Sequence, residues 1–335
     1  MSILSVQDLS VRFETEDGPV QAVNEVAFDL EPGEVLAIVG ESGCGKSVTA
    51  MSLLGLLPDS ALVSGRAQFG GENLLACPLP QLRRVRGREI SFIFQDPMTS
   101  LNPVLTVGRQ IGEVLRRHLN MSRRKARTRT IELLELVGIP APEHRLSQYP
   151  HQLSGGLRQR VMIAMAISCD PKVLIADEPT TALDVTIQAA VLDVLREVRG
   201  RLSMAIVLIT HDLGVVADIA DRVIVMYAGQ KVEEAAVEEL FAHPQHPYTL
   251  GLLGAVPRVG AAAHNGARSN GHRARLTEIP GLVPALPGPP EACPFAERCP
   301  RADEQSRSAM PALEEVRPGH RVACFHPGED GGDGA

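Results

Sequence analysis

The segment Gly40-Glu41-Ser42-Gly43-Cys44-Gly45-Lys46-Ser47, here called the phosphate loop, constrains this chain more than any other stretch. It fits the pattern G-x-x-x-x-G-K-[ST], in which backbone N–H groups surround phosphate oxygens. An apolar, strand-like segment at 35–39 precedes it, and a helical pattern follows it. This order predicts that Lys46 reaches the β- and γ-phosphates and that the Ser47 hydroxyl holds Mg²⁺ at a helix N-terminus. A glycine-rich turn that matches by accident would lack this context, so the sequence predicts a nucleotide site.

Composition excludes several other classes of protein. The formal net charge is −7, aromatic residues make up 3 % and there is no Trp, so we expect no nucleic-acid partner. Residues 1–8 lack the order of a signal peptide, and no uncharged apolar run approaches the roughly 18 residues that span a bilayer. The six cysteines are divided between the main body and the C-terminal part, a pattern typical of the reducing cytosol.

Apolar segments alternate with helical patterns through the main body, which predicts a mainly parallel α/β core. Residues 3–39 instead have the pattern of short strands and turns, a small β-rich lobe that leads into the phosphate loop. Residues 98–165 are mostly helical in pattern, and Ser122 is the expected N-cap of one helix. The basic run after Ser122 is interpreted as a solvated helix face, with a partner or lipid-headgroup contact as the alternative.

Polar side chains end three of the predicted strands. Gln95 follows one strand and is placed to contact Mg²⁺ or the attacking water. Asp177 and Glu178 end another, so we expect Asp177 to bind Mg²⁺ through water and Glu178 to orient or deprotonate the attacking water. His211 ends a third strand, where it would sense the γ-phosphate and brace Glu178; a structural hydrogen bond is the alternative.

A second glycine-rich element, Leu-Ser-Gly-Gly-x-x-Gln-Arg at 153–160, opens a helix. Its exposed N–H groups form an anion-receptive helix end, although an ordinary Ser-capped helix gives the same pattern. Phe13 closes an alternating strand segment and could pack in the core or stack on an adenine ring.

Taken together, these motifs resemble the ATPase subunit of an ABC transporter. The phosphate loop, Gln95, the element at 153–160, the segment Val-Leu-Ile-Ala-Asp-Glu at 173–178, Asp184 and His211 occur in that family's order. More narrowly, Phe-Gln-Asp-Pro-Met-Thr-Ser-Leu-Asn-Pro at 94–103, His-Pro-Tyr-Thr at 246–249 and the Cys-rich tail look like the oligopeptide/dipeptide importer branch. That branch also contains nickel and glutathione importers.

The resemblance implies a P-loop ABC ATPase fold: a RecA-like parallel-sheet core, an N-terminal antiparallel β lobe, an inserted α-helical subdomain and a small Cys-containing C-terminal extension. It also implies a set of site residues. Glu178, His211 and Gln95 would be catalytic, and Ser47, Gln95 and Asp177 would hold Mg²⁺. ATP would be bound by Phe13, Gly40, Glu41, Ser42, Gly43, Cys44, Gly45, Lys46, Ser47, Val48, Ser154, Gly155, Gly156, Gln159 and Asp184.

The resemblance further implies how the protein works. Two ATPase subunits would form a head-to-tail dimer with ATP between the phosphate loop of one and Ser154-Gly155-Gly156 of the other. Closure would be passed near Gln95 and the helical subdomain to two membrane permeases. The second ATPase would be a sister chain, an extracytoplasmic solute-binding protein would complete the complex, and the chain would lie peripherally on the cytoplasmic face of the membrane. The expected task is uptake of di-/oligopeptides, with nickel or glutathione as alternatives.

The expected domains are a nucleotide-binding domain at 1–255 (helical subdomain about 98–165), a flexible linker at 256–276, an extension at 277–327 and a disordered tail at 328–335. The extension contains Cys293, Cys299 and Cys324. In this branch four cysteines often occur here and in some members bind an iron–sulfur cluster, but Ser306 stands where the fourth is expected. His320 or His326 could complete a zinc or iron site. The alternative is a set of cysteines without a metal.

Two other classes of function remain as alternatives. A soluble ABC-type ATPase acting on nucleic acid or the ribosome is disfavoured by the single cassette, the acidic charge and the scarce aromatics. A P-loop GTPase or kinase is disfavoured because the guanine-reading Asn-Lys-x-Asp pattern is absent. The segment His-Pro-Gln-His-Pro at 243–247 is interpreted as a rigid turn before a helix rather than a metal site.

Overall fold

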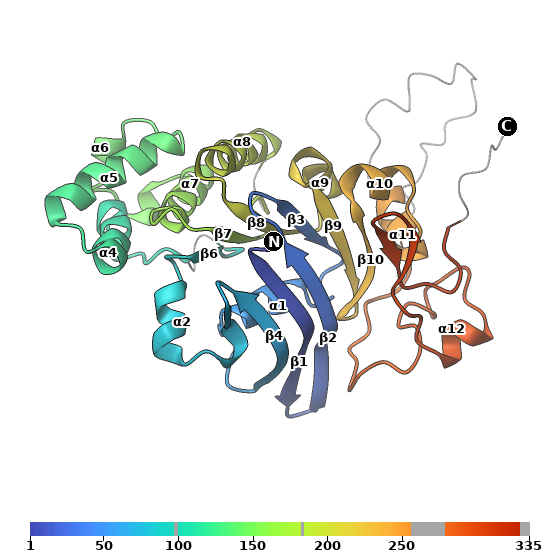
Figure 1. Ribbon diagram of the computed structural model, residues 1–335. Coiled ribbons are helices and arrows are strands. Elements are labelled where there is room, and N and C mark those ends of the chain that lie inside the picture. Colours follow the sequence, from blue (N-terminus) through green and yellow to red (C-terminus); the bar gives the residue numbers. More distant parts are fainter. Residues whose placement is uncertain (97–99, 182–183, 256–278, 329–335) are drawn as a thin grey trace, which may run out of the picture.

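In the computed structural model, two β-sheets and a set of helices form one elongated molecule (Figure 1). The structure describes residues 1–96, 100–181, 184–255 and 279–328. The predicted linker and nearly all of the predicted tail lie outside these ranges, as does the segment Pro-Met-Thr at 97–99. No helix within the described ranges is both long and apolar enough to cross a membrane.

The N-terminal lobe is the predicted antiparallel sheet, with strand order β2-β1-β4-β5. Its strands are longer than the short ones expected, because the turn at 16–17 joins two strands of 12 and 13 residues. Along both strands buried apolar residues alternate with exposed polar ones, as a half-buried sheet requires. The bounds are β1 (Leu4–Thr15), β2 (Gly18–Leu30), β4 (Ala61–Phe69) and β5 (Glu72–Asn73).

The main sheet has the strand order β11-β12-β10-β9-β3-β8-β7-β6, and β3, β6, β7, β8 and β9 are parallel, which confirms the expected core. The central strands β3, β7 and β8 are buried along their whole length, since both faces of the sheet are covered. Because these strands run parallel, their carboxyl ends lie together at the same end of the sheet. The bounds are β3 (Val35–Val39), β6 (Ile90–Ile93), β7 (Val173–Asp177), β8 (Ala205–Thr210), β9 (Arg222–Tyr227) and β10 (Gln230–Ala236).

Two hydrophobic cores cover the two faces of this sheet, one shared with α7, α8 and α9 and the other with α1 and the N-terminal sheet. The inserted helical subdomain contains α4 to α7, and Ser122 caps α5 as predicted, its Oγ accepting from the N–H of Lys125. The helices are α1 (Lys46–Leu53), α2 (Leu79–Val85), α4 (Val107–Leu119), α5 (Arg123–Leu136), α6 (Pro142–Arg145), α7 (Gly155–Ala166), α8 (Val185–Leu202), α9 (Leu213–Ile219), α10 (Val237–Ala242), α11 (Pro247–Gly254) and α12 (Glu304–Ser308), with 3-10 turns η1 (Leu74–Ala76) and η2 (Pro150–Gln152).

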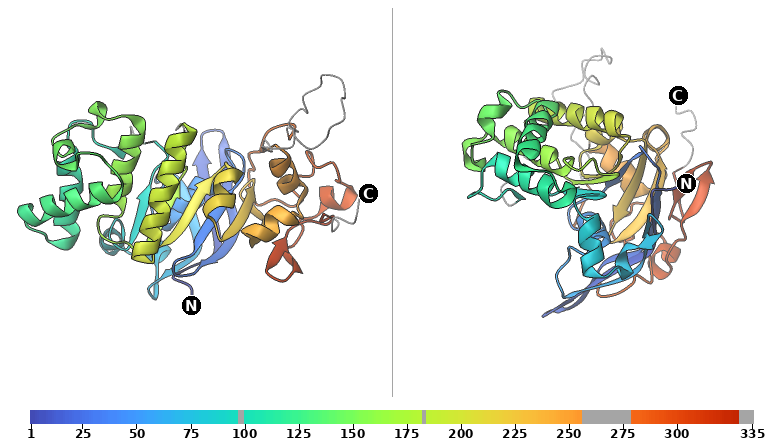
Figure 2. Two further views of the ribbon diagram at one scale, coloured as in Figure 1. Left: turned by 90° about the horizontal axis from the view of Figure 1, so that it is seen from above. Right: turned by 60° about the vertical axis from the view of Figure 1, so that its left-hand side comes forward.

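The C-terminal extension is built into the main sheet. Its hairpin, β11 (Glu314–Arg317) and β12 (His320–Val322), pairs antiparallel with the edge of β10. A second contact is made at the N-terminal lobe, where the N–H of Gln21 donates to the carbonyl of Leu286 over 2.7 Å. The helical subdomain and the extension lie at opposite ends of the molecule (Figure 2).

Candidate nucleotide-binding and hydrolytic site

The phosphate loop joins β3 to α1, as the sequence predicts. Gly45 precedes α1 with a φ of +97°, and a Cβ there would lie 2.3 Å from the carbonyl oxygen of Ala22, so only glycine fits. Lys46 is 5 % exposed, and its Nζ donates to the carbonyls of Gly40 and Glu41 over 2.8 and 2.9 Å. The loop therefore holds its ammonium group inward, where a phosphate chain would be bound.

The other loop residues divide into an outer rim and a buried base. Ser42 and Gly43 are exposed, and Val48 is half-buried on α1. Cys44 is fully buried, and burial raises the pKa of its thiol. Position 40 has no room for a side chain, because a Cβ at Gly40 would lie 2.2 Å from the carbonyl oxygen of Met226 and 2.7 Å from the Cys44 Sγ atom. These positions suit a loop whose outer N–H groups face a ligand.

The pair Ser47 and Asp177 suits a magnesium ion. The Ser47 hydroxyl, in the first turn of α1, donates to Asp177 Oδ1 at the end of β7 over 2.9 Å. Asp177 is 5 % exposed, and this burial raises the pKa of its carboxyl group. Hydroxyl and carboxylate oxygens are the ligands that Mg²⁺ prefers, and a cation would offset the cost of a buried negative charge.

Glu178 is the centre of the proposed catalytic cluster. Its Oε2 accepts from Gln95 Nε2 over 2.9 Å and from Thr181 Oγ1 over 2.8 Å, and its Oε1 lies 3.2 Å from His211 Nδ1. Burial alone would raise the pKa of Glu178, but the hydrogen bonds with Thr181 and His211 and the charges of His211 and Lys46 leave it below its ordinary value. The carboxylate is therefore ionised at neutral pH and able to accept a proton.

The backbone of Glu178 lies in the left-handed region, with a φ of +47°, which is costly for a residue with a side chain. Its N–H donates to the carbonyl of Ile209 on β8 over 2.8 Å, so the neighbouring strand fixes this turn. The turn aims the carboxylate at Gln95 and His211, which follow the two adjacent strands. Sequence reasoning missed Thr181, although a hydroxyl three residues after a catalytic carboxylate is a readable signal.

Helix α7, which begins within the glycine-rich element at 153–160 and is here called the signature helix, is not part of this cluster. Ser154 is exposed and caps α7, its Oγ accepting from the N–H of Leu157. Gly155 is exposed, and Gly156 packs against Ile187 of α8, where a Cβ would lie 2.6 Å from the Ile187 Cγ2 atom. The first turn of α7 thus has the Ser cap of an ordinary capped helix. It also has the exposed N-terminus that an anion-binding helix end requires.

Three further residues predicted to bind ATP differ in their surroundings. Phe13 is half-buried on β1 and packs at the margin of the core, so part of its ring stays accessible. Asp184 is exposed and caps α8, accepting from the N–H of Ile187 over 3.0 Å. Gln159 is 2 % exposed, and its side-chain Nε2 has no hydrogen-bond partner among the described residues.

The proposed metal site in the extension is not supported. Cys293, Cys299 and Cys324 are free thiols, and across residues 279–328 and the other described ranges no three His, Cys, Asp or Glu side chains are grouped to hold a metal. Ser306, at the expected fourth-cysteine position, is buried and hydrogen-bonded to Asp303.

The two histidines considered as fourth ligands have other partners. His320 Nε2 lies 2.7 Å from Glu233 Oε1, and His326 Nε2 lies 2.9 Å from Asp303 Oδ2. The described residues therefore give no support for an iron–sulfur cluster or a zinc ion at these cysteines. By contrast, the segment at 243–247 forms the predicted turn into α11, with His246 as its N-cap and Pro247 in its first turn.

Fold and site together define a P-loop ATPase. Comparison with known proteins then gives the family. The model of the ABC transporter family matches residues 23–181, and that of the oligopeptide/dipeptide transporter C-terminal region matches residues 232–305. The dipeptide transport ATP-binding protein DppD of Bacillus subtilis is 53 % identical over 96 % of this chain and 94 % of its own length. The oligopeptide transport ATP-binding protein OppD of Escherichia coli is 50 % identical over 98 % of this chain and 94 % of its own.

Solved structures agree with this result. The ATP-binding cassette MJ0796, in a dimeric post-hydrolysis state bound to ADP and Pi, matches 70 % of this chain and 98 % of its own, with a TM-score of 0.63 and 26 % identity. The chain belongs to the ABC transporter family, as one of its ATP-hydrolysing subunits.

Proposed function

We propose that this chain energises the uptake of di- or oligopeptides across the cytoplasmic membrane, using ATP and Mg²⁺ at the site described above. The names of its relatives support peptides as the cargo, since similar chains serve dipeptide and oligopeptide transport. The observation that carries the proposal is the cluster around Glu178, which lies beside the Ser47–Asp177 pair at one edge of the sheet. Nickel or glutathione remain alternative cargoes.

Each side chain has a distinct task in this proposal. Lys46 contacts the β- and γ-phosphates, Ser47 and Asp177 hold Mg²⁺, and Phe13 stacks on the adenine ring. Glu178 accepts the proton of the water that attacks the γ-phosphorus, and the bond from that phosphorus to the bridging oxygen breaks as ADP leaves. Gln95 and His211 hold the Glu178 carboxylate in line for this transfer.

A second ATPase subunit would complete the site. Ser154 and Gly155 are exposed at the start of α7, and an exposed helix N-terminus is a favourable partner for a γ-phosphate. In a head-to-tail dimer each signature helix would close over the phosphate loop of its partner. The dimeric state of the similar cassette MJ0796 supports pairing of two such subunits. The partner would be a sister chain.

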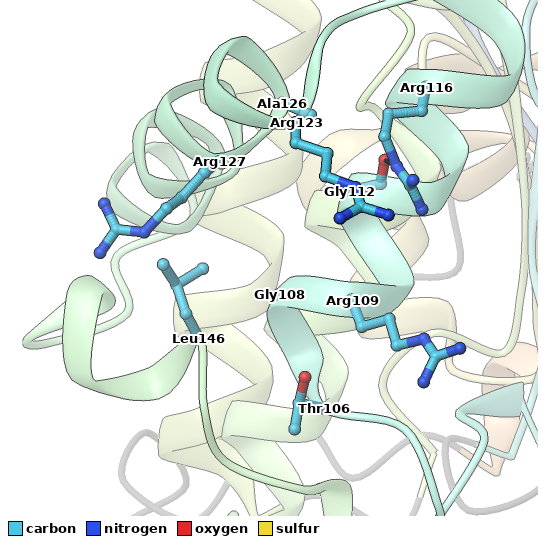
Figure 3. Close-up of a pocket in the computed structure, with 9 residues that line it drawn as sticks. All are labelled: Thr106, Gly108, Arg109, Gly112, Arg116, Arg123, Ala126, Arg127 and Leu146. Atoms are coloured by element: carbon cyan, nitrogen blue, oxygen red, sulfur yellow. Dashed lines mark hydrogen bonds between the residues drawn. The ribbon is translucent and has the colours of Figure 1, made fainter.

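A pocket in the helical subdomain supports a contact with the membrane permeases. It has a volume of about 560 Å³ and is lined from α4 and α5 by Arg109, Arg116, Arg123 and Arg127 (Figure 3). The residues that line it include no acid, although the whole chain carries a net charge of −7. A permease segment that docks here would therefore carry acidic side chains.

Charge reversal tests this contact. The double variant Arg109→Glu/Arg123→Glu should lose permeases on purification from membranes while still binding ATP. Arg84→Glu, at an exposed position on α2, is the matched control. Unchanged recovery of permeases with the double variant would leave these arginines as a solvated face.

The whole proposal is tested by purifying tagged Glu178→Gln from detergent-solubilised native membranes in the presence of ATP. We expect two permeases, a second ATPase subunit and an extracytoplasmic solute-binding protein, with the chain attached peripherally to the cytoplasmic face. Ligand screening on that binding protein then separates peptides from nickel and glutathione. Recovery from the soluble fraction with ribosomes or nucleic acid would overturn the transport function.

A further inference from the structure

Glu41, the second residue of the phosphate loop, is bound by an arginine of the C-terminal extension. Arg298 NH1 donates to Glu41 Oε2 over 2.7 Å, and NH2 donates to Oε1 over 3.0 Å. The two residues are 257 positions apart in the chain. Both carboxylate oxygens are engaged, which is the bidentate geometry that gives such pairs their strength and fixed orientation.

Arg298 is itself held rigidly. Its side chain is 7 % exposed, and it donates from Nε to the carbonyl of Pro280 over 2.7 Å and from NH2 to the carbonyl of Ile279 over 3.1 Å. Its guanidinium lies over the rings of Tyr227 and Phe295, 5.6 and 5.9 Å from their centroids. These contacts fix the guanidinium before it meets Glu41, so the arginine can hold the loop rather than follow it.

The backbone of Glu41 is held from the same side. Its N–H donates to the hydroxyl of Tyr248 over 2.7 Å, and Tyr248 is fully buried in α11. The Tyr248 ring packs against those of Tyr227 and Phe295, with centroids 4.8 and 5.4 Å away. Phe295 belongs to the extension, so the same aromatic cluster fixes both partners of Glu41.

These contacts continue to the phosphate-binding lysine. The carbonyl of Glu41 accepts from Lys46 Nζ over 2.9 Å, so the residue that Arg298 holds is also the residue that holds Lys46. We propose that Arg298 is a positioning residue for the phosphate loop, and that the C-terminal extension is thereby a working part of the ATP site. This inference rests on the proposed ATP-binding role of the loop.

A positioning role predicts a coupling that a merely structural role does not. Removing either partner should release the same loop, so the effects of Arg298→Ala and Glu41→Gln on ATP affinity should not add. The site around Glu178 does not include Arg298, so KM for ATP should rise while kcat changes little. Lysine offers a single ammonium charge in place of the two-pronged guanidinium, so the ATP affinity of Arg298→Lys should lie between those of wild type and Arg298→Ala.

The test measures Mg²⁺-dependent binding of a fluorescent ATP analogue to full-length chains: wild type, Arg298→Ala, Arg298→Lys, Glu41→Gln and the double variant Arg298→Ala/Glu41→Gln. Arg307→Ala, at an exposed position on α12 of the same extension, is the matched control. We expect each of Arg298→Ala and Glu41→Gln to weaken binding about tenfold, the double variant to be no weaker than either, and the control to match wild type. ATPase kinetics of the same chains supply KM and kcat.

The outcomes separate this inference from the function on which it rests. If wild type binds no ATP, the proposed function is wrong and this inference with it. If wild type binds ATP and Arg298→Ala or Glu41→Gln stays within about twofold of it, or if their effects add, this inference alone is overturned. Should Arg298→Ala fail to fold, Glu41→Gln and Arg298→Lys decide the question, because neither leaves a cavity beside the aromatic cluster.

Discussion

The two halves of the proposed ATP site differ in how far this chain completes them. Around the phosphate loop, Lys46, Asp177 and Glu178 already have partners within the chain, and their side chains are largely buried. Lys46 donates to carbonyls of the loop itself, Asp177 accepts from Ser47 on α1, and Glu178 accepts from Gln95 after β6. At the signature helix, Ser154 and Gly155 are exposed and Ser154 bonds only to its own helix among the contacts described. One half is organised within the chain, and the other lies open.

This difference would give a physical reason for the proposed ATP-dependent association of two subunits. A site that is complete in one chain would hydrolyse ATP without any motion. A site whose second half must come from a partner stabilises the transition state only in the closed dimer, so hydrolysis is linked to closure. The open half would then couple ATP hydrolysis to the closing and opening of the dimer.

The largest effect is expected from Glu178→Gln in the organised half. The amide cannot accept a proton, so kcat should fall at least about a hundredfold while ATP affinity stays within about threefold. Light scattering with ATP and Mg²⁺ should then detect accumulated dimers. Glu143→Gln, on exposed α6, is the control. Near-normal turnover by Glu178→Gln would remove this residue from the catalytic role.

Ser154→Arg tests the open half. A bulky cation at the start of α7 should block closure, so hydrolysis should fall about a hundredfold while nucleotide binding is retained. Ser147→Arg, at an exposed position before the signature, should behave as wild type. Hydrolysis that survives Ser154→Arg would mean that α7 does not complete the site.

Mixing the two inactive chains sharpens the comparison further. If copies of this chain pair with each other, a dimer of Glu178→Gln and Ser154→Arg contains one intact site and one doubly altered site. The mixture should then recover activity that neither chain has alone. If only a sister chain can be the partner, no activity returns on mixing, and each variant must instead be assayed with that sister.

A smaller effect is expected from Gly156→Ala, which tests whether packing fixes the open half. The new Cβ would lie 2.6 Å from Ile187 Cγ2, so overpacking should lower the free energy of unfolding by about 1–3 kcal/mol. Adding Ile187→Ala should recover part of the loss. Gly200→Ala, at a helical position with no atom near the new Cβ, should instead raise the free energy of unfolding by roughly 0.5–1 kcal/mol. Denaturant unfolding measures all four, and equal stability for Gly156→Ala and wild type would contradict the packing.

The smallest effect is expected from Thr181→Val, which removes one hydrogen bond from Glu178. Burial stays while a stabilising donor is lost, so the pKa of Glu178 should rise toward or above its ordinary 4.5. A protonated Glu178 cannot act as base, so kcat falls as pH drops through this pKa, and the acid limb should move to higher pH. The pH profile of kcat measures this shift, with Thr128→Val on α5 as control. An acid limb that does not move would mean that Thr181 does not tune Glu178.

Much of the organised half was predictable because its signals are local. Gln95, Glu178 and His211 each follow an apolar strand, and carboxyl ends of parallel strands meet at one edge. The parallel core and the Ser122 cap were also predictable from local signals: apolar segments that alternate with helical patterns, and a serine directly before a helix. The bonds from Gln95 and His211 to Glu178 agree with the roles expected for them, which remain proposals.

What could not be predicted depends on contacts between distant segments. Nothing near Arg298 in the sequence points to Glu41, because the pairing exists only once the extension folds against the loop. The hairpin β11–β12 was missed likewise, since three or four residues carry too little periodicity to mark a strand. The hypothesis of a metal at Cys293, Cys299 and Cys324 came from family resemblance, and the surrounding side chains do not support it.

The hairpin that pairs with β10 has a practical consequence for handling the protein. An unpaired strand at the edge of a sheet offers N–H and C=O groups to any other chain and promotes aggregation. Here β12 covers that edge and stays attached through Glu233 and Glu234 of β10. A truncated chain that lacks the hairpin would leave the edge of β10 unpaired. Such forms should aggregate through pairing of this strand with other chains.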